Sequence, residues 1–272
     1  MIRLIGLDLD GTTLRSDKSL SEHTREVLER AIVAGVHVAV ASGRPYCSLP
    51  ACLWDVRGLE YAVCSNGASV WHLGGNRQIF HDGLSAEAVS LMIQVSREMN
   101  LLMEAYINGE AYAPVIYLED PVQYGCPPGS ASYFQTTRHP VEDIRAFMRE
   151  HIDELDCLDF LIGSQEQRTN VREALSKLSG IYVTSSVPHL VEVASPKAGK
   201  ANALSWLAGN LGIRRSEVLA CGNAENDMDM ILWAGVGAAV SDSPEEVKAA
   251  ADIVIADCDH DGVAEVIEEW VL

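Results

Sequence analysis

Short aliphatic runs alternate with amphipathic stretches through the first third of the chain. The runs at 2–8, 36–41 and 61–64 are almost wholly apolar and end in polar residues, as strands buried on both faces do. Residues 21–34 place their apolar side chains on one helical face, and Gly35 follows as a stop signal. Strands that alternate with helices in this way predict a parallel sheet with right-handed crossovers.

The last third of the chain repeats this alternation. We predict strands at 189–194, 217–221, 236–240 and 252–255, and helices at 200–211, 226–233, 243–251 and 261–270. The two outer thirds therefore predict one α/β domain with a doubly wound, Rossmann-like parallel sheet.

The middle of the chain follows a different pattern. Residues 69–81 predict a hairpin around a pair of glycines, and the Pro-, Gly- and Ser-rich stretch 119–139 predicts irregular structure. We further predict helices at 85–99, 140–151 and 165–178, and strands at 101–106, 158–162 and 181–187. This second α/β pattern predicts a domain at 83–188, inserted into a discontinuous domain made of 1–82 and 189–272.

The charge balance narrows the choice of partners. With 39 acidic residues against 20 Lys and Arg, the chain carries a formal net charge of −19, which repels nucleic acid and anionic membranes. An acidic protein that binds an anionic substrate needs a local positive charge, such as a metal ion and a lysine. The seven cysteines form no CxxC pair, and no apolar stretch is long enough to span a membrane, so we expect a cytoplasmic protein.

The segment Asp8-Leu9-Asp10-Gly11-Thr12 carries the first chemical signal, because it follows the first strand directly. Carboxylates at i and i+2 of an extended chain point the same way, and they repel unless a cation lies between them or one holds a proton. Asp8 can attack phosphorus as a carboxylate, and Asp10 can protonate the leaving oxygen and then activate water. Gly11 allows a tight turn whose following amides, beginning at Thr12, can face a phosphate. An acid-rich turn is also common after strands, so the motif needs support elsewhere.

Three further segments lie at strand ends or helix starts. Ser42, Gly43 and Arg44 follow the second strand, where a hydroxyl, an amide and a cation could hold a phosphate or substrate. Lys200 opens a helix, and its ammonium could neutralise a phosphate together with the nucleophile. Residues 222–227, GNAEND, place polar side chains after another strand. Each segment alone is an ordinary turn or a solvated lysine, but in open α/β sheets ligands bind at this edge.

Together, DLDGTTL at 8–14, SGR at 42–44, Lys200 in GKANAL and GNAEND at 222–227 resemble the four motifs of haloacid-dehalogenase-type hydrolases. SNGA at 65–68 and residues 234–254 resemble the same family. The insert between the second and third motifs is similar in size and position to the α/β cap of its Cof-like phosphatase subfamily. The resemblance implies a magnesium-dependent phosphatase that hydrolyses a small phosphorylated metabolite, often a sugar phosphate.

The resemblance also implies a role for each matching residue. Asp8 corresponds to the nucleophile and a Mg²⁺ ligand, and Asp10 to the general acid/base, whose backbone carbonyl also ligates the metal. Lys200 corresponds to the lysine that holds nucleophile and phosphate. The remaining matches are a phosphate-binding hydroxyl, a phosphate-contacting amide and a carboxylate that supports the metal shell: Ser42, Asn226 and Asp227.

One position departs from the family pattern. Asn223 stands where the family usually has an aspartate that ligates magnesium. An amide oxygen can still ligate Mg²⁺ but brings no charge, so we expect weaker metal binding. Alternatively, the replacement is tolerated because Asp8 and Asp227 already supply two negative charges.

Two other functions remain open from the sequence. A phosphomutase would form the same aspartyl-phosphate but pass the phosphoryl group to a sugar. A binding or regulatory protein with a weakened site would rest on Asn223 alone. Other chemistries lack their residues, since the chain has no P-loop, no GxSxG and no HExxH. The sequence indicates neither the physiological substrate nor the oligomeric state.

Overall fold

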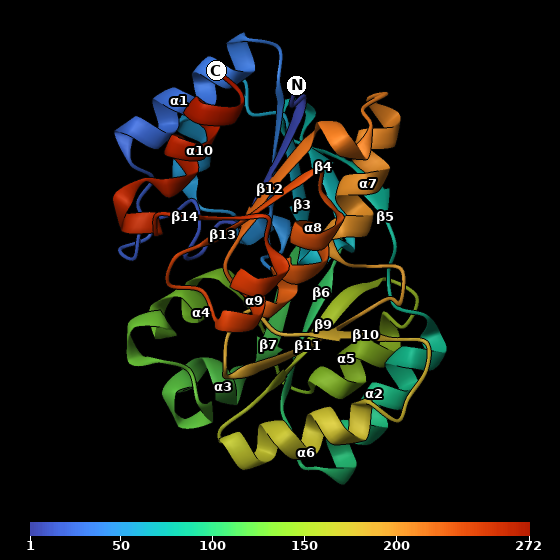
Figure 1. Ribbon diagram of the computed structural model, residues 1–272. Coiled ribbons are helices and arrows are strands. Elements are labelled where there is room, and N and C mark those ends of the chain that lie inside the picture. Colours follow the sequence, from blue (N-terminus) through green and yellow to red (C-terminus); the bar gives the residue numbers. More distant parts are fainter. The chain divides into compact units, whose positions relative to one another are not determined.

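The computed structural model describes residues 1–272, which form two compact units, each with its own β-sheet (Figure 1). The first unit comprises residues 1–44, 49–80 and 199–272, and the second comprises 45–48 and 81–198. Neither unit contains a helix with the length and apolar composition needed to cross a bilayer.

The first unit is built on an eight-stranded sheet. Its strands are β1 (Leu4–Leu7), β2 (His37–Ala41), β3 (Tyr61–Cys64), β4 (Ser69–His72), β5 (Arg77–His81), β12 (Val218–Gly222), β13 (Val236–Val240) and β14 (Ile253–Ile255). Their order in the sheet is β14-β13-β12-β1-β2-β3-β4-β5. The pairings from β14 to β3 are parallel, and β4 runs antiparallel to β3. The predicted parallel, doubly wound core is therefore confirmed.

Helices cover both faces of this sheet (Figure 1). They are α1 (Glu22–Val33), α7 (Lys200–Asn210), α8 (Met228–Trp233), α9 (Glu245–Ala250) and α10 (Gly262–Trp270). Ile5 and Leu7 of β1 belong to a buried cluster with α1 and α10, whereas Leu4 belongs to a second cluster with α7 and α8. Because successive strand residues point to opposite faces, each strand contributes to both cores.

The second unit is a six-stranded sheet with the order β10-β11-β9-β6-β7-β8. Its elements are α2 (Ala86–Glu98), β6 (Met103–Ile107), β7 (Glu110–Pro114), α3 (Val115–Glu119), α4 (Ala131–Thr137), β8 (His139–Val141), α5 (Ile144–Glu150), β9 (Leu155–Leu161), α6 (Gln165–Leu175), β10 (Tyr182–Thr184) and β11 (Leu190–Ala194). Phe160 of β9 is buried with α2, α5 and α6, whereas the next residue, Leu161, is buried with Tyr117 and Phe134 of α3 and α4. The two helix groups therefore cover opposite faces of the sheet.

Two predictions in the middle of the chain are wrong, and two strands there were missed. Residues 189–194 were predicted to be a strand of the parallel sheet, but β11 pairs antiparallel with β9 and β10, and the second unit runs to Ala198. The stretch 119–139, predicted to be irregular, contains α4, which buries Phe134. Two strands of the second sheet, β7 and β8, were not predicted, and both contain a proline.

Candidate active site

Three neighbouring strands of the first unit, β12, β1 and β2, carry the predicted motifs at their carboxyl ends. Asp8 follows β1, Ser42 follows β2 and Asn223 follows β12. The register pairs Leu7 with Cys221 and with Val40, so the three strands stop within a few residues of one another. Segments more than 200 positions apart in the sequence are thereby brought to one edge of the sheet.

A buried ion network lies at this edge. Lys200, the first residue of α7, donates from Nζ to Asp8 Oδ1 at 2.7 Å and to Asp227 Oδ1 at 2.6 Å. The three side chains are buried, and that of Lys200 is fully enclosed. Two carboxylates therefore share one ammonium where water cannot screen them.

The ionisation of Asp8 and Lys200 follows from this enclosure. Burial and the charge of Asp227 raise the pKa of Asp8 to about 7, although Lys200 opposes the shift. Burial alone would lower the pKa of Lys200, but the charges of Asp227 and Asp8 outweigh it and raise that pKa. Lys200 is thus a permanent cation, and its charge favours the ionised form of Asp8, which burial and Asp227 disfavour.

The loop after β12 is folded around Asp227. Oδ2 of Asp227 accepts hydrogen bonds from the backbone amides of Asn223 and Ala224, both at 2.9 Å. Since its Oδ1 accepts from Lys200, both carboxylate oxygens already have protein partners. Asp227 therefore fixes the loop that presents Asn223.

Asn223 in turn contacts the turn after β1. Thr12 Oγ1 donates to Asn223 Oδ1 at 3.2 Å. Gly11 has φ +86°, and a Cβ at this position would lie 2.5 Å from Asn223 Nδ2. The backbone of Thr12, Thr13 and Leu14 donates to the carbonyl of Leu9, which closes the turn. Only glycine suits position 11, because both the left-handed conformation and the contact exclude a side chain.

Asp10 is held by two cations. Arg44 donates from Nε to Asp10 Oδ2 at 2.6 Å and from its terminal nitrogen to Oδ1 at 2.8 Å, and Lys18 Nζ lies 3.0 Å from Oδ1. Burial alone would raise the pKa of Asp10, but the hydrogen bonds and charges of Arg44 and Lys18 lower it to about 2. Asp10 is therefore ionised here, and Arg44 is engaged by this carboxylate.

The loop after β2 contains Ser42, and Asn66 links this loop to Asn226. Ser42 is buried, and its Oγ accepts from the Arg44 amide at 3.2 Å. Asn226 is also buried, and its Nδ2 donates to Asn66 Oδ1 at 2.9 Å. Asn66 also accepts on its carbonyl from the Gly199 amide, directly before Lys200. All four predicted segments are thus linked within the first unit.

Three residues at this site were not predicted as site residues. Lys18 pairs with Asp10, Asn66 binds Asn226, and Asp229 accepts from the Ala201 amide at 3.1 Å, which caps the start of α7. SNGA at 65–68 was a signal for Asn66, although it suggested no role. An acid two positions after Asp227 gave no signal by itself, because its partner lies 28 residues away.

The donor atoms at this edge are those that suit a hard divalent cation. The carboxylate of Asp8, the backbone carbonyl of Asp10 and the side-chain carbonyl of Asn223 are oxygen ligands, which Mg²⁺ prefers. No three His, Cys, Asp or Glu side chains in the chain are grouped for metal binding, so a cation here would also need Asn223 or a backbone carbonyl. The residues present therefore fit magnesium, with Asp227 supporting the loop from behind.

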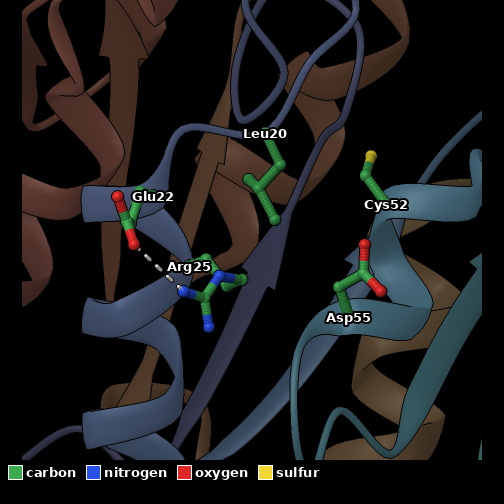
Figure 2. A pocket seen from close by; sticks show the side chains of 5 residues that line it. All are labelled: Leu20, Glu22, Arg25, Cys52 and Asp55. Carbon is green, nitrogen blue, oxygen red and sulfur yellow. Dashed lines mark ion pairs between the residues drawn. The ribbon is translucent and has the colours of Figure 1, made fainter.

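A separate pocket of about 400 Å³ lies between α1 and the short helix Ala51–Asp55 (Figure 2). It is lined by Leu20, Glu22, Arg25, Cys52 and Asp55. None of these is a predicted site residue, Arg25 is paired with Glu22, and burial raises the pKa of the Cys52 thiol. The pocket therefore adds no group to the chemistry at the strand ends.

Comparison with known proteins identifies the family. A sequence model of haloacid dehalogenase-like hydrolases matches residues 5–267, so the chain belongs to this family of hydrolytic enzymes. One relative is 5-amino-6-(5-phospho-D-ribitylamino)uracil phosphatase YitU of Bacillus subtilis, which is 28% identical and aligns over 98% of this chain and 97% of its own.

Two solved structures share the fold. A haloacid dehalogenase-like hydrolase from Bacteroides thetaiotaomicron is 28% identical, with a TM-score of 0.80 and 99% of each chain covered. Another from B. subtilis has a TM-score of 0.87 at 23% identity, with both chains covered completely. The predicted family and the fold class, a Rossmann-like core with an inserted cap, are confirmed.

Proposed function

We propose that this chain is a magnesium-dependent phosphatase that hydrolyses a phosphate monoester of a small metabolite through an aspartyl-phosphate on Asp8. The observation that carries the proposal is the buried contact of Lys200 with both Asp8 and Asp227, with Asp10 two residues from Asp8. A nucleophilic carboxylate, a fixed cation and a second carboxylate are the groups that phosphoryl transfer through a covalent intermediate requires.

The reaction has two displacements at phosphorus. A carboxylate oxygen of Asp8 bonds to phosphorus while the bond to the leaving oxygen breaks, and Asp10 gives its proton to that oxygen. A water molecule then loses a proton to Asp10 and bonds to phosphorus, and the bond to Asp8 breaks. Inorganic phosphate is released and both aspartates return to their starting state.

Asp10 needs two protonation states in this cycle. The pairing with Arg44 and Lys18 suits the second displacement, in which an ionised carboxylate takes a proton from water. For the first displacement Asp10 must carry a proton, so the pairing with Arg44 has to loosen when substrate binds. An anionic substrate would compete with Asp10 for the same guanidinium, which gives Arg44 a part in substrate binding.

The remaining groups would bind the phosphate and the metal. Mg²⁺, when bound, neutralises charge on the phosphate and on the attacking carboxylate. We assign it to the Asp8 carboxylate, the Asp10 carbonyl and Asn223, with Asp227 holding the loop. The phosphate oxygens are assigned to Lys200 and to a set of hydroxyl and amide groups from Thr12, Ser42, Gly43 and Asn226.

The substrate class rests on the relatives. The name of the B. subtilis relative specifies a ribityl phosphate, and one solved structure with the same fold is described as a sugar phosphatase. We therefore propose a sugar phosphate or a similar polyhydroxylated phosphate monoester. The seven cysteines are all free, which supports a reducing, cytosolic location.

A second candidate function follows from Asn223. An uncharged residue at the metal site would weaken Mg²⁺ binding, and a chain with too little bound metal would hold a phosphorylated metabolite without turning it over. This alternative gives phosphate binding without hydrolysis.

Phosphate release from p-nitrophenyl phosphate and a panel of sugar phosphates, with magnesium or with EDTA, tests the proposal. We expect magnesium-dependent turnover that falls by about a thousandfold or more in Asp8→Asn, because the nucleophile is lost. Asp242→Asn, an exposed aspartate of the same unit, is the matched control and should keep full activity. No turnover of any substrate at saturating magnesium, together with measurable phosphate binding, would favour the binding protein.

A further inference from the structure

The loop after β3 has an unusual backbone. Ser65, Asn66 and Gly67 are all left-handed, with φ values of 51°, 52° and 88°. Serine rarely adopts this conformation, and three such residues in a row persist only when the surroundings hold them. A Cβ on Gly67 would lie 2.2 Å from the carbonyl oxygen of Gly199, so this loop packs directly against the start of α7.

Asn66 joins three of the four motif segments. Its amide donates to the Ser42 carbonyl at 3.1 Å, and its carbonyl accepts from the Gly199 amide at 2.8 Å. Its side-chain Oδ1 accepts from Asn226 Nδ2 at 2.9 Å. One residue therefore connects the loop after β2, the residue before Lys200 and the loop after β12.

The Asn226 side chain depends on this contact. Asn226 is 2% exposed, and its Oδ1 has no hydrogen-bond partner. Its only side-chain hydrogen bond in the protein is the one to Asn66, so Asn66 fixes which way the amide of Asn226 points. An amide that is to meet a phosphate oxygen must present its NH₂ group in one orientation.

We propose that Asn66 is a positioning residue of the phosphate site, which orients the Asn226 amide through its side chain and holds the start of α7 through its backbone. The inference rests on the proposed function, because it takes Asn226 and Lys200 as phosphate ligands. It adds a residue from a loop outside the four motif segments.

The substitution Asn66→Gly separates the side-chain role from the conformational role. Glycine adopts the left-handed conformation readily, so the backbone contacts to Ser42 and Gly199 are kept while the amide is removed. Asn76→Gly is the matched control, since Asn76 is also left-handed, with φ 45°, but lies exposed in the β4–β5 hairpin. A purely conformational role for Asn66 would leave both variants active.

The measurements are kcat and KM for p-nitrophenyl phosphate and the dissociation constant of inorganic phosphate, both with magnesium. We expect Asn66→Gly to lose about tenfold in kcat/KM and in phosphate affinity, the scale of one lost hydrogen bond to an oriented group. Asn76→Gly should stay within about twofold of the parent chain. Parent-like values for Asn66→Gly would overturn the proposal.

A double-mutant cycle tests whether Asn66 acts through the side chain of Asn226. If Asn66 acts through Asn226, the double variant Asn66→Gly, Asn226→Ala should have the same kcat/KM and phosphate affinity as Asn226→Ala alone. Losses that multiply would overturn a side-chain route. Should the parent chain bind phosphate without turnover, the hydrolase proposal fails while the same cycle, measured by phosphate binding, still tests Asn66. A parent chain that binds no phosphate overturns both.

Discussion

Asn223, the proposed magnesium ligand, lies in a crowded environment. Its Oδ1 accepts from Thr12, and its Nδ2 faces the Cα of Gly11 closely enough to exclude a Cβ there. Its backbone N–H donates to the Asp227 carboxylate. The residue is therefore fixed in place, and for the proposed role as a magnesium ligand it differs from an aspartate in charge alone.

Asn223→Asp should bind magnesium more tightly. A carboxylate of nearly the same shape adds a charge at the cation and can still accept from Thr12. We expect the magnesium concentration at half-maximal activity to fall by about tenfold, measured after removal of metal with EDTA and stepwise return. Asn76→Asp adds the same charge far from the motif segments in sequence and should leave the magnesium concentration at half-maximal activity unchanged. Equal half-saturation for Asn223→Asp and the parent would contradict the prediction.

At the residue scale, the sequence revealed the groups that follow strands but not the contacts between them. Asp8, Ser42 and Asn223 could be found because each lies directly after an aliphatic run. The pairing of Arg44 with Asp10, and the contribution of Lys18, depend on where a turn returns in space. No local pattern encodes that return, so these contacts needed the structure.

The second sheet carries a row of acids on neighbouring strands. Glu192 of β11 is paired in register with Asp159 of β9, and Asp159 with Glu104 of β6. All three are buried on one face. Like charges directly opposite in a sheet repel, so the row must be neutralised or protonated.

The row is neutralised only in part. Arg138 donates to Glu104 through Nε and a terminal nitrogen, and the Tyr106 hydroxyl donates to Asp159 Oδ2 at 2.6 Å. Burial, followed by the charges of Glu192 and Glu104, raises the pKa of Asp159 well above its usual range. The folded state therefore favours the protonated form of Asp159.

This proton makes the stability of the chain pH-dependent. Asp159 loses its proton near pH 4 in the unfolded chain but only at higher pH in the folded one, so its stabilising contribution is complete below pH 4 and is lost as pH rises. Asp159→Asn is neutral at every pH and can still accept from Tyr106. In the parent chain, the free energy of unfolding should fall with rising pH by up to about 1.4 kcal/mol per pH unit because of Asp159, and the substitution should remove this fall. Denaturant midpoints from pH 4 to 9 measure it.

The control for this prediction is Asp153→Asn, an exposed aspartate of the same unit. It should leave the pH profile of the parent unchanged. A parent-like profile for Asp159→Asn as well would mean that Asp159 is ionised in the folded state.

At the element scale, long periodic segments were predictable and short ones were not. The strand β11 was predicted correctly as a strand and placed in the wrong sheet, because an aliphatic run buried on both sides reads the same in either sheet. The helix α4 follows Pro and Gly residues and has one large buried side chain, Phe134, so it lacks an amphipathic pattern. Both errors reflect tertiary packing, which decides among local options.

For the whole molecule, the acidic surface opposes folding. The formal net charge of −19 is far from balance, and folding brings those charges closer together. Against this negative charge, the site at the strand ends contains three cations, each paired with an aspartate: Lys200, Arg44 and Lys18. The proposed binding of an anionic substrate therefore rests on these residues, and on the proposed metal ion, rather than on the field of the whole molecule.

Salt should stabilise the chain by screening this repulsion. Raising sodium chloride from about 0.01 to 0.3 M at pH 7.5 shortens the screening length severalfold, and we expect the melting temperature to rise by a few degrees. The same scan near the isoelectric point of about 4.7, where net charge is small, should give little change. A melting temperature that falls with salt at pH 7.5 would mean that specific ion pairs outweigh the net repulsion.

The position of β1 affects the order in which a newly made chain can fold. β1 lies between β2 and β12, and Leu7 pairs with Cys221. A ribosome that adds about 5–20 residues per second needs roughly 10–40 s to synthesise the segment between these partners. During this interval the whole of residues 81–198 emerges, whereas β1 has an unpaired edge. The inserted unit can therefore be complete first, and the nascent first strand is the segment that a chaperone would need to protect.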